Sequence, residues 1–278
     1  MKIESFFTIG KRHSEEGIPC EDYALSEKIQ DKFFGVVSDG CSGANAKTDI
    51  GARLWSLSAL NVIEENIFNG KGLLPDNFTS LLIEDFKENR ITKNNQDEIA
   101  SLIVLIADNR NAKIWLMGDG GYALKHNNGD VTLYYYKWVD NAPLYPAYLL
   151  EPNFFKNLGK RNNMKDVAFT LTKTRFSFNT NNKLIIKEHT CDTHGWDKMK
   201  NGLVINVDKE NQDISEIAII TDGLWSFNNI TPFMVIDFCL DIEKNEILRK
   251  HIVDVISYFN EHGATNKDDF SIVKFDWN

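Results

Sequence analysis

Cysteine and proline are both scarce in this chain. The four cysteines follow no regular spacing and stand at Cys20, Cys41, Cys191 and Cys239. Small secreted domains held by disulfides space their cysteines as a framework, so we expect reduced thiols and a cytoplasmic location. The six prolines are spread thinly, and no repeat or low-complexity linker interrupts the sequence. We therefore predict a single domain over residues 1–278, with an irregular aromatic insertion at about 137–165.

Long apolar runs and an excess of positive charge are also missing. The longest apolar stretch, residues 99–107, is far shorter than the roughly 20 residues that cross a bilayer. No apolar segment follows the first basic residues, so we expect neither a signal peptide nor a membrane partner. Lys and Arg number 31 against 40 Asp and Glu, which gives a net charge of −9. Such a charge repels a phosphate backbone and disfavours nucleic acid as a partner.

The apolar pattern alternates between strand and helix periods. Strands are predicted at 33–38, 99–107, 113–117, 121–125, 131–136, 167–172, 203–207, 217–221 and 270–275. Helices are predicted at 50–67, 78–86, 232–240 and 245–260, where apolar residues recur every three or four positions. Hairpins with segregated helices favour an α+β fold over strict βαβ alternation. The apolar face of the first helix is expected to carry Ile50, Leu54, Leu57, Leu60, Ile63 and Ile67.

Aspartates recur where the predicted strands end. Asp39, Asp119 and Asp222 each follow an apolar strand and precede a glycine, and Asp268 and Asp269 stand directly before the last strand. One Asp-Gly pair is ordinarily only a turn. Several carboxylates gathered at strand ends repel one another, and hard cations such as Mg²⁺ and Mn²⁺ relieve that repulsion. From spacing alone, simple turns and a metal site are about equally favoured.

The order of these motifs resembles a known family. The segments are Glu21-Asp22, residues 36–43 (VVSDGCSG), 116–121 (LMGDGG), 220–225 (ITDGLW) and 267–272 (KDDFSI). Together they resemble the metal-dependent serine/threonine phosphatases of type 2C over nearly the whole chain, and the opening residues 10–22 are most similar to a bacterial branch. The resemblance implies a sandwich of two mostly antiparallel β-sheets, flanked by α-helices on both outer faces in four layers. The predicted elements agree with that fold.

The resemblance also implies a site for two ions, Mg²⁺ or Mn²⁺. Asp39 should bridge both ions, and the backbone carbonyl of Gly40 should bind the second. Asp222 and Asp268 should complete the first ion's ligands, and Glu21 should hold metal-bound water. A hydroxide bridging the two ions would attack the phosphorus of phosphoserine or phosphothreonine, while the ions neutralise charge in the transition state. No phospho-enzyme is expected.

Three features depart from the family pattern. Cys41 stands where many eukaryotic members carry a histidine, so no general acid is evident. Asp119 matches the position that binds a third metal in bacterial members, but Ser226 replaces the aspartate that usually supports it. The arginine that usually grips phosphate before the Glu-Asp pair is absent. Arg12 and His13 are the candidates to replace it, unless their segment is only a solvated loop.

The sequence therefore predicts a phosphoprotein phosphatase, for which the resemblance suggests a serine/threonine kinase as counterpart. A pseudophosphatase that keeps the fold and binds phosphoproteins with little turnover is the main alternative. The departures above favour it, whereas the retained Asp39, Asp222 and Asp268 oppose it. A metallohydrolase of a small phosphoester is a third interpretation, which assays with phosphopeptides and nucleotides would separate from the first.

Overall fold

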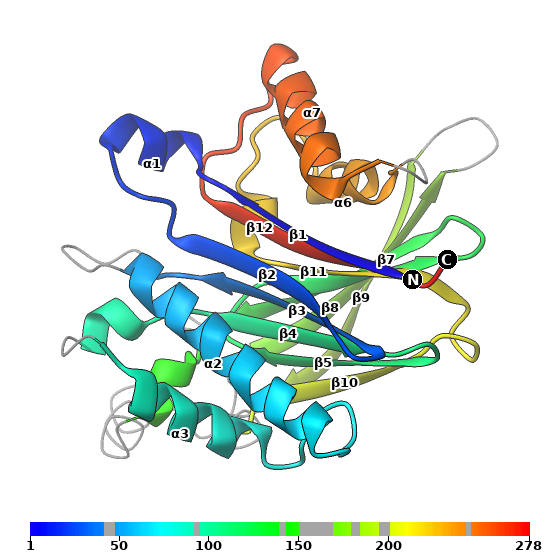
Figure 1. Ribbon diagram of the computed structural model, residues 1–278. Helices are drawn as coiled ribbons and strands as arrows, with labels where there is room; N and C mark the ends of the chain where they lie inside the picture. Colours follow the sequence, from blue (N-terminus) through cyan, green and yellow to red (C-terminus); the bar gives the residue numbers. More distant parts are fainter. Residues whose placement is uncertain are drawn as a thin grey trace.

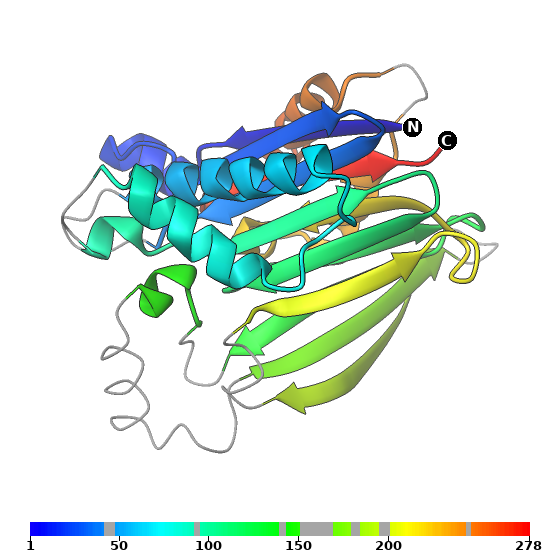
Figure 2. The same cartoon turned by 60° about the horizontal axis from the view of Figure 1, so that its bottom comes forward.

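Two β-sheets pack face to face between two layers of helices in this computed structural model (Figures 1 and 2). The structure describes residues 1–41, 48–91, 95–138, 143–150, 169–178, 184–194, 201–242 and 246–278. Most of the predicted insertion, residues 139–142 and 151–165, lies outside these ranges. Residues 137 and 138 are not part of an insertion, because they continue a strand.

The larger sheet contains the two ends of the chain. Its seven strands lie in the order β1 (Lys2–Thr8), β12 (Phe270–Asp276), β11 (Ile214–Ile220), β6 (Gly121–His126), β7 (Val131–Trp138), β8 (Phe169–Phe178) and β9 (Leu184–His194). Every pairing in this order is antiparallel. The first and last strands pair along their full length, from Lys2 opposite Asp276 to Thr8 opposite Phe270, so the termini lie side by side (Figure 1).

The smaller sheet is also antiparallel and has the more apolar centre. Its five strands lie in the order β10 (Leu203–Asp208), β5 (Asn111–Met117), β4 (Leu102–Ala107), β3 (Lys32–Asp39) and β2 (Asp22–Ile29). All six residues of β4 are buried, as expected of a central strand covered on both faces.

Helices cover the outer face of each sheet (Figure 1). The helices are α1 (Lys11–Glu16), α2 (Thr48–Phe68), α3 (Phe78–Asn89), α6 (Pro232–Leu240) and α7 (Leu248–Glu261), with short 3-10 helices η1 (Asn95–Glu98), η3 (Pro146–Leu149) and η4 (Asp222–Trp225). Helices α2 and α3 lie over the five-stranded sheet, and α6 and α7 lie over the seven-stranded sheet (Figures 1 and 2). The predicted four-layer α+β sandwich is confirmed.

The predicted apolar face of α2 was wrong in its first half. The buried face instead carries Ala52, Trp55, Ala59, Val62, Ile63 and Ile67, while Leu57 is 44% exposed. Trp55 decides the rotation, because its ring stacks on Phe86 at a centroid distance of 3.6 Å and its Nε1 donates to the carbonyl of Glu98. A large buried ring with a satisfied N–H outweighs the aliphatic periodicity.

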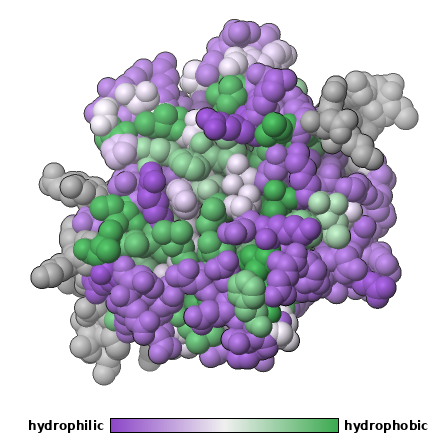
Figure 3. Space-filling model, viewed as in Figure 1, coloured by the Kyte–Doolittle hydropathy of each residue, from purple (hydrophilic) through white to green (hydrophobic). Residues whose placement is uncertain are grey.

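Two apolar clusters hold the layers together. One fills the space between the sheets and continues under α2 and α3, and the other lies between the seven-stranded sheet, α6 and α7. The outward surface seen in Figure 3 is mostly hydrophilic, with hydrophobic patches between the helical layers. In the described parts of the chain, no helix combines the length and apolar character that crossing a bilayer requires.

Candidate active site

Four aspartates lie where strands begin or end, at one end of the sandwich. Asp39 is the last residue of β3 and pairs in register with Asp22, the first residue of β2. Asp222 opens η4 directly after β11. Asp119 lies in the turn between β5 and β6, and the first residue of β6 pairs with the last residue of β11. The sheet topology thus gathers carboxylates that are far apart in the sequence.

Asp22 and Asp39 form a carboxyl pair, with Asp22 buried and Asp39 partly exposed. A hydrogen bond joins the two side chains, and Thr221 Oγ1 donates another to Asp22 Oδ2 at 2.7 Å. Burial raises the pKa of Asp22 to about 8. Desolvation, followed by the charges of Asp222, Asp22 and Asp119, raises the pKa of Asp39 well above its usual range. A hydrogen bond between two carboxyl groups needs a proton, so the pair shares one.

Asp119 and Asp222 extend this pair toward solvent. Burial, followed by the charge of Asp222, raises the pKa of Asp119 to about 7. Desolvation, followed by the charge of Asp268, raises the pKa of Asp222, although that residue is exposed. Asp119 Oδ1 is buried and has no hydrogen-bond partner within the part of the chain that the structure describes. An unpartnered buried carboxylate oxygen is costly and calls for a ligand.

The donor chemistry of this cluster fits a hard divalent cation. Across the described ranges, Asp22, Asp39, Asp119 and Asp222 form no ion pair with a basic side chain. Carboxylate oxygen is the donor that Mg²⁺ and Mn²⁺ prefer, and a cation would satisfy the unpartnered oxygen of Asp119. The ligand set is not fully assembled, because no three His, Cys, Asp or Glu side chains among the described residues converge as a complete metal site.

Asp268 lies at the edge of the cluster and is held by Arg12. The residue stands between α7 and β12, and its side chain is 45% exposed. Arg12, on the short helix α1, donates from Nη2 to Asp268 Oδ1 at 3.1 Å. The segment that carries Arg12 is therefore helical, and its guanidinium lies beside a predicted metal ligand. Its predicted contact with phosphate stays a prediction.

Asp269, next in the chain, points inward and anchors the same helix. Its carboxylate accepts hydrogen bonds from the backbone N–H groups of Gly10 at 2.7 Å and Glu21 at 2.6 Å, and from His13 Nδ1 at 2.9 Å. His13 is buried, and its Nε2 lies 3.0 Å from Arg12 Nη2. The structure thus places His13 in a buried network behind Arg12, and its predicted contact with phosphate stays a prediction.

Glu21 and Gly40 lie next to each other just beyond the ends of the paired strands β2 and β3. The N–H of Gly40 donates to the carbonyl of Glu21 at 3.1 Å, which continues the register of Asp22 with Asp39. Glu21 is buried, and its Oε2 lies 3.6 Å from His13 Nε2. Both residues therefore flank the carboxyl pair, and their predicted roles as metal ligands stay predictions.

Ser226 stabilises the loop that carries Asp268. Its hydroxyl donates to Asn266 Oδ1 at 2.6 Å or to the carbonyl of Gly223 at 2.7 Å, and it accepts from the N–H of Asp268 at 3.2 Å. A serine here supplies no charge to an ion at Asp119, but it fixes the backbone position of Asp268.

Cys41 lies at the rim of the cluster and contacts Tyr145. A hydrogen bond joins the two side chains. Desolvation raises the pKa of the Cys41 thiol, and the charges of Asp119, Glu21 and Asp222 raise it further. The thiol therefore stays protonated near neutral pH and is a poor nucleophile.

Sequence reasoning gave no role to Asp22, Asp269 or Tyr145. In the Asp268–Asp269 pair the residue that it passed over is the buried one, whereas Glu21 and Asp22 are both buried. Asp22 could have been found by aligning β2 with β3, because the register sets it opposite Asp39. Nothing in the local sequence marks Tyr145, which reaches the site from a segment remote in sequence.

Comparisons with known proteins agree with this fold. Residues 9–144 match the family model described as Protein phosphatase 2C. Among solved structures, a bacterial serine phosphatase is similar at 12% identity, with a TM-score of 0.56 over 100% of this chain and 98% of that one. The serine/threonine phosphatase Stp1 from Staphylococcus aureus is similar at 11% identity, with a TM-score of 0.57 over 99% and 94%. A comparison with curated proteins gives no match.

The match to the family model spans just under half of the chain, so the chain is similar to the protein phosphatase 2C family over its N-terminal half. Its sequence match covers Glu21, Asp39 and Asp119, and it ends before Asp222 and Asp268. At this low identity, the similarity to solved structures shows the fold alone. In this chain, that fold brings Asp222 and Asp268 to the same end of the sandwich as the other aspartates. Protein serine/threonine phosphatase is the class of enzyme that this match and this fold support.

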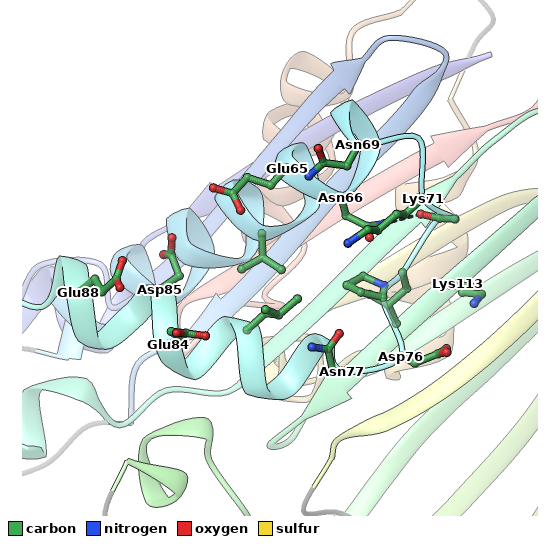
Figure 4. Close-up of a pocket in the computed structure, with 15 residues that line it drawn as sticks. Glu65, Asn66, Asn69, Lys71, Asp76, Asn77, Glu84, Asp85, Glu88 and Lys113 are labelled. Atoms are coloured by element: carbon green, nitrogen blue, oxygen red, sulfur yellow. Dashed lines mark hydrogen bonds between the residues drawn. The ribbon is translucent and has the colours of Figure 1, made fainter.

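A separate cavity lies in the outer helical layer, away from the carboxylates. Its volume is about 630 Å³, and it lies between α2, α3 and the segment that joins them (Figure 4). Glu65, Asp85 and Glu88 line it on the helices, with Lys71 and Lys113 farther along. None of the clustered aspartates at the strand ends lines this cavity.

Proposed function

We propose that this protein hydrolyses phosphoserine and phosphothreonine in proteins with the help of two divalent cations. The observation that carries the proposal is the cluster of Asp22, Asp39, Asp119 and Asp222, whose carboxyl pKa values are raised in a protein phosphatase 2C fold. Groups with strongly shifted pKa values gather at functional sites. Carboxylates with a purely structural role would form ion pairs with basic side chains. Within the described residues, these four side chains form no such pair.

The ions would be Mg²⁺ or Mn²⁺, held by Asp39, Asp222, Asp268, the Gly40 carbonyl and, through water, Glu21. Asp119 would serve a third and weaker ion, because Ser226 adds no carboxylate there. When bound, such ions supply Lewis acidity, which activates water and neutralises phosphoryl charge.

The chain's own residues bind and orient the phosphorylated side chain. Arg12 would grip the phosphoryl oxygens, since its guanidinium suits a planar, two-point contact with phosphate. Asp268 holds that guanidinium in place, and Asp269 fixes the helix beneath it through the N–H of Gly10. Cys41 would take no part as a nucleophile, because its raised pKa keeps the thiol protonated. With water as the attacking group, no phospho-enzyme would form.

The substrate would be a phosphorylated protein, and a serine/threonine kinase would produce it. Cys20, Cys41 and Cys239 are free thiols, which supports the proposed cytoplasmic location.

The test is hydrolysis of a phosphothreonine peptide with Mn²⁺ or Mg²⁺, with and without EDTA. We expect turnover that requires the metal and is lost on chelation. A nucleotide substrate is assayed beside the peptide, and a preference for the nucleotide would favour the small-phosphoester interpretation. Turnover that persists in EDTA would contradict the mechanism.

A pseudophosphatase is the second candidate, because no complete metal site is assembled among the described residues. It predicts that the phosphopeptide binds tightly in the presence of Mn²⁺ while no phosphate is released. Measuring peptide binding and phosphate release on the same sample separates the two functions.

A further inference from the structure

An aromatic cavity opens beside the carboxylate cluster. Its volume is about 400 Å³, within the range of roughly 300–1,000 Å³ typical of ligand pockets. Four rings form its walls, from Tyr135, Tyr136, Trp138 and Trp225. Asp119 and Asp222 line it as well, so the cavity and the proposed metal site share two side chains.

The aromatic wall is tied to the turn that carries Asp119. Trp138 donates from its ring N–H to the carbonyl of Gly118 at 2.9 Å. The backbone N–H of Tyr136 donates to the carbonyl of Gly120 at 3.4 Å. β7 therefore holds the peptide units on both sides of Asp119. The cavity is a preformed part of the site, because hydrogen bonds join its wall to the turn that carries Asp119.

The opposite wall comes from Trp225, three residues after Asp222. Its ring packs against that of Tyr135 at a centroid distance of 5.2 Å. Both rings are partly exposed, whereas Tyr136 and Trp138 are buried. The cavity thus has a buried side and an accessible side, as a recess for an inserted group requires.

The lining indicates what kind of group would enter. Among the described residues that line the cavity, none is Lys, Arg, Asn or Gln, so it offers no donor set for a second phosphate. Carboxylates at its edge repel an acidic side chain. Large rings favour an apolar or aromatic group, which gains from leaving water and from ring-to-ring contact.

We propose that this cavity receives an apolar side chain of the substrate, preferably aromatic, one or two residues from the phosphorylated Ser or Thr. The proposal rests on the proposed function, because it takes the phosphoryl group to lie at the carboxylates. Asp222 belongs to both sites, and an extended peptide advances only about 3.3–3.6 Å per residue. The occupant must therefore be close in sequence to the phosphorylated residue.

The test compares phosphothreonine peptides that differ only at the flanking positions, with Phe, Leu, Ala or Lys there. Values of kcat/KM are measured with Mn²⁺ for the wild type and for Trp225→Ala and Tyr135→Ala. Tyr134→Ala is the matched control, because its ring lies on the same strand but stacks on Tyr122 and does not line the cavity. Circular dichroism and melting temperature confirm that each variant folds.

We expect the wild type to prefer Phe over Ala by about tenfold or more, as hydrophobic pockets discriminate. Trp225→Ala and Tyr135→Ala should bring the Phe-to-Ala ratio close to one, whereas Tyr134→Ala should keep it. A ratio near one in the wild type would overturn the proposal. So would a ratio that neither cavity variant changes, or a preference for Lys, which would indicate a cation–π site instead.

A binding measurement keeps this test separate from the proposed function. Fluorescence anisotropy of the same labelled peptides reports affinity even when no phosphate is released. If turnover is absent but the Phe peptide binds more tightly than the Ala peptide, and Trp225→Ala removes the difference, the cavity assignment stands and the catalytic proposal fails. Equal affinities would overturn the cavity assignment whether or not the protein is an active phosphatase.

Discussion

The negative charges around Asp39 destabilise its ionised carboxylate. It shares a hydrogen bond with Asp22, and the charges of Asp222, Asp22 and Asp119 all raise its pKa. No basic side chain pairs with it in the part of the chain that the structure describes. The residue therefore opposes folding when no cation is bound and would favour binding when one is present.

Asp39→Asn should raise the melting temperature of the metal-free protein. The substitution keeps the size of the side chain and removes a charge that its neighbours repel. Asp31→Asn is the matched control, because Asp31 is exposed and paired only with Lys32. Differential scanning calorimetry in EDTA measures both variants. A melting temperature that falls for Asp39→Asn, or rises equally for Asp31→Asn, would show that the cluster has no such destabilising effect.

The raised carboxyl pKa values also predict how the stability of the metal-free protein depends on pH. Asp22 and Asp119 titrate in the folded state at about 8 and about 7, against 3.8 when unperturbed. The unfolded chain therefore releases these protons at lower pH than the folded chain. The free energy of unfolding should fall as pH rises from about 4 to about 8.

Urea denaturation in EDTA at several pH values measures this dependence. Other groups titrate over the same range, so the quantity to compare is the difference between the wild type and Asp39→Asn. The fall in the free energy of unfolding with rising pH should be shallower in Asp39→Asn, because one of the mutually repelling carboxylates is gone. Parallel curves would mean that the carboxyl groups titrate independently of Asp39.

At the scale of elements, the site depends on how closely two segments approach the loop that carries Asp268 and Asp269. Helix α1 begins after Gly10, and η4 contains Gly223. A methyl group added at Gly10 would overlap the backbone of Asp268, and one at Gly223 would overlap the carbonyl oxygen of Asp269. These glycines let the start of α1 and η4 pack against the loop that carries Asp268 and Asp269.

Gly223→Ala should therefore destabilise the fold by about 1–3 kcal/mol, the usual cost of overpacking, and should weaken Mn²⁺ binding as well. Gly72→Ala is the control, because a methyl group there meets open space. Chemical denaturation and a Mn²⁺ titration of both variants give the two readouts. If Gly223→Ala is as stable as Gly72→Ala, the close packing of η4 on this loop is not required.

Whether a strand could be predicted from the sequence depends on its place in the sheet. Central strands such as β3, β4 and β11 were predicted because both faces are covered and the residues are almost all apolar. The strands that were not predicted are β1, β2 and β9, and each lies at the edge of a sheet. Edge strands are partly exposed and mix polar with apolar residues, so their pairing is set by the neighbouring strand rather than by their own pattern.

The sequence predicted the residues of the candidate site that stand at the ends of apolar strands. Asp39, Asp119 and Asp222 stood out because each ends an apolar run before glycine. Asp22 and Asp269 did not, because their burial depends on register and on helix α1, which local sequence does not specify. Tertiary contacts decide that Asp269 rather than Asp268 faces inward, and single-sequence reasoning has no access to them.

At the scale of the whole molecule, a net charge of −9 is combined with a local concentration of carboxylates at one end of the sandwich. Such a field attracts divalent cations and repels a phosphorylated protein until cations are bound. The metal is therefore expected to bind first and the substrate second. The proposed activity therefore depends first on how tightly the protein binds the metal.

Calorimetric titration of Mn²⁺ into the metal-free protein tests that property most directly. The wild type should bind about two ions per chain. Asp39→Asn should lower the affinity by about 10–100-fold or more, the scale of loss seen even for groups behind the ligands, and Asp31→Asn should leave it unchanged. A wild-type protein that binds no Mn²⁺, or an Asp39→Asn variant that titrates as the wild type does, would contradict the assignment of the carboxylate cluster as a metal site.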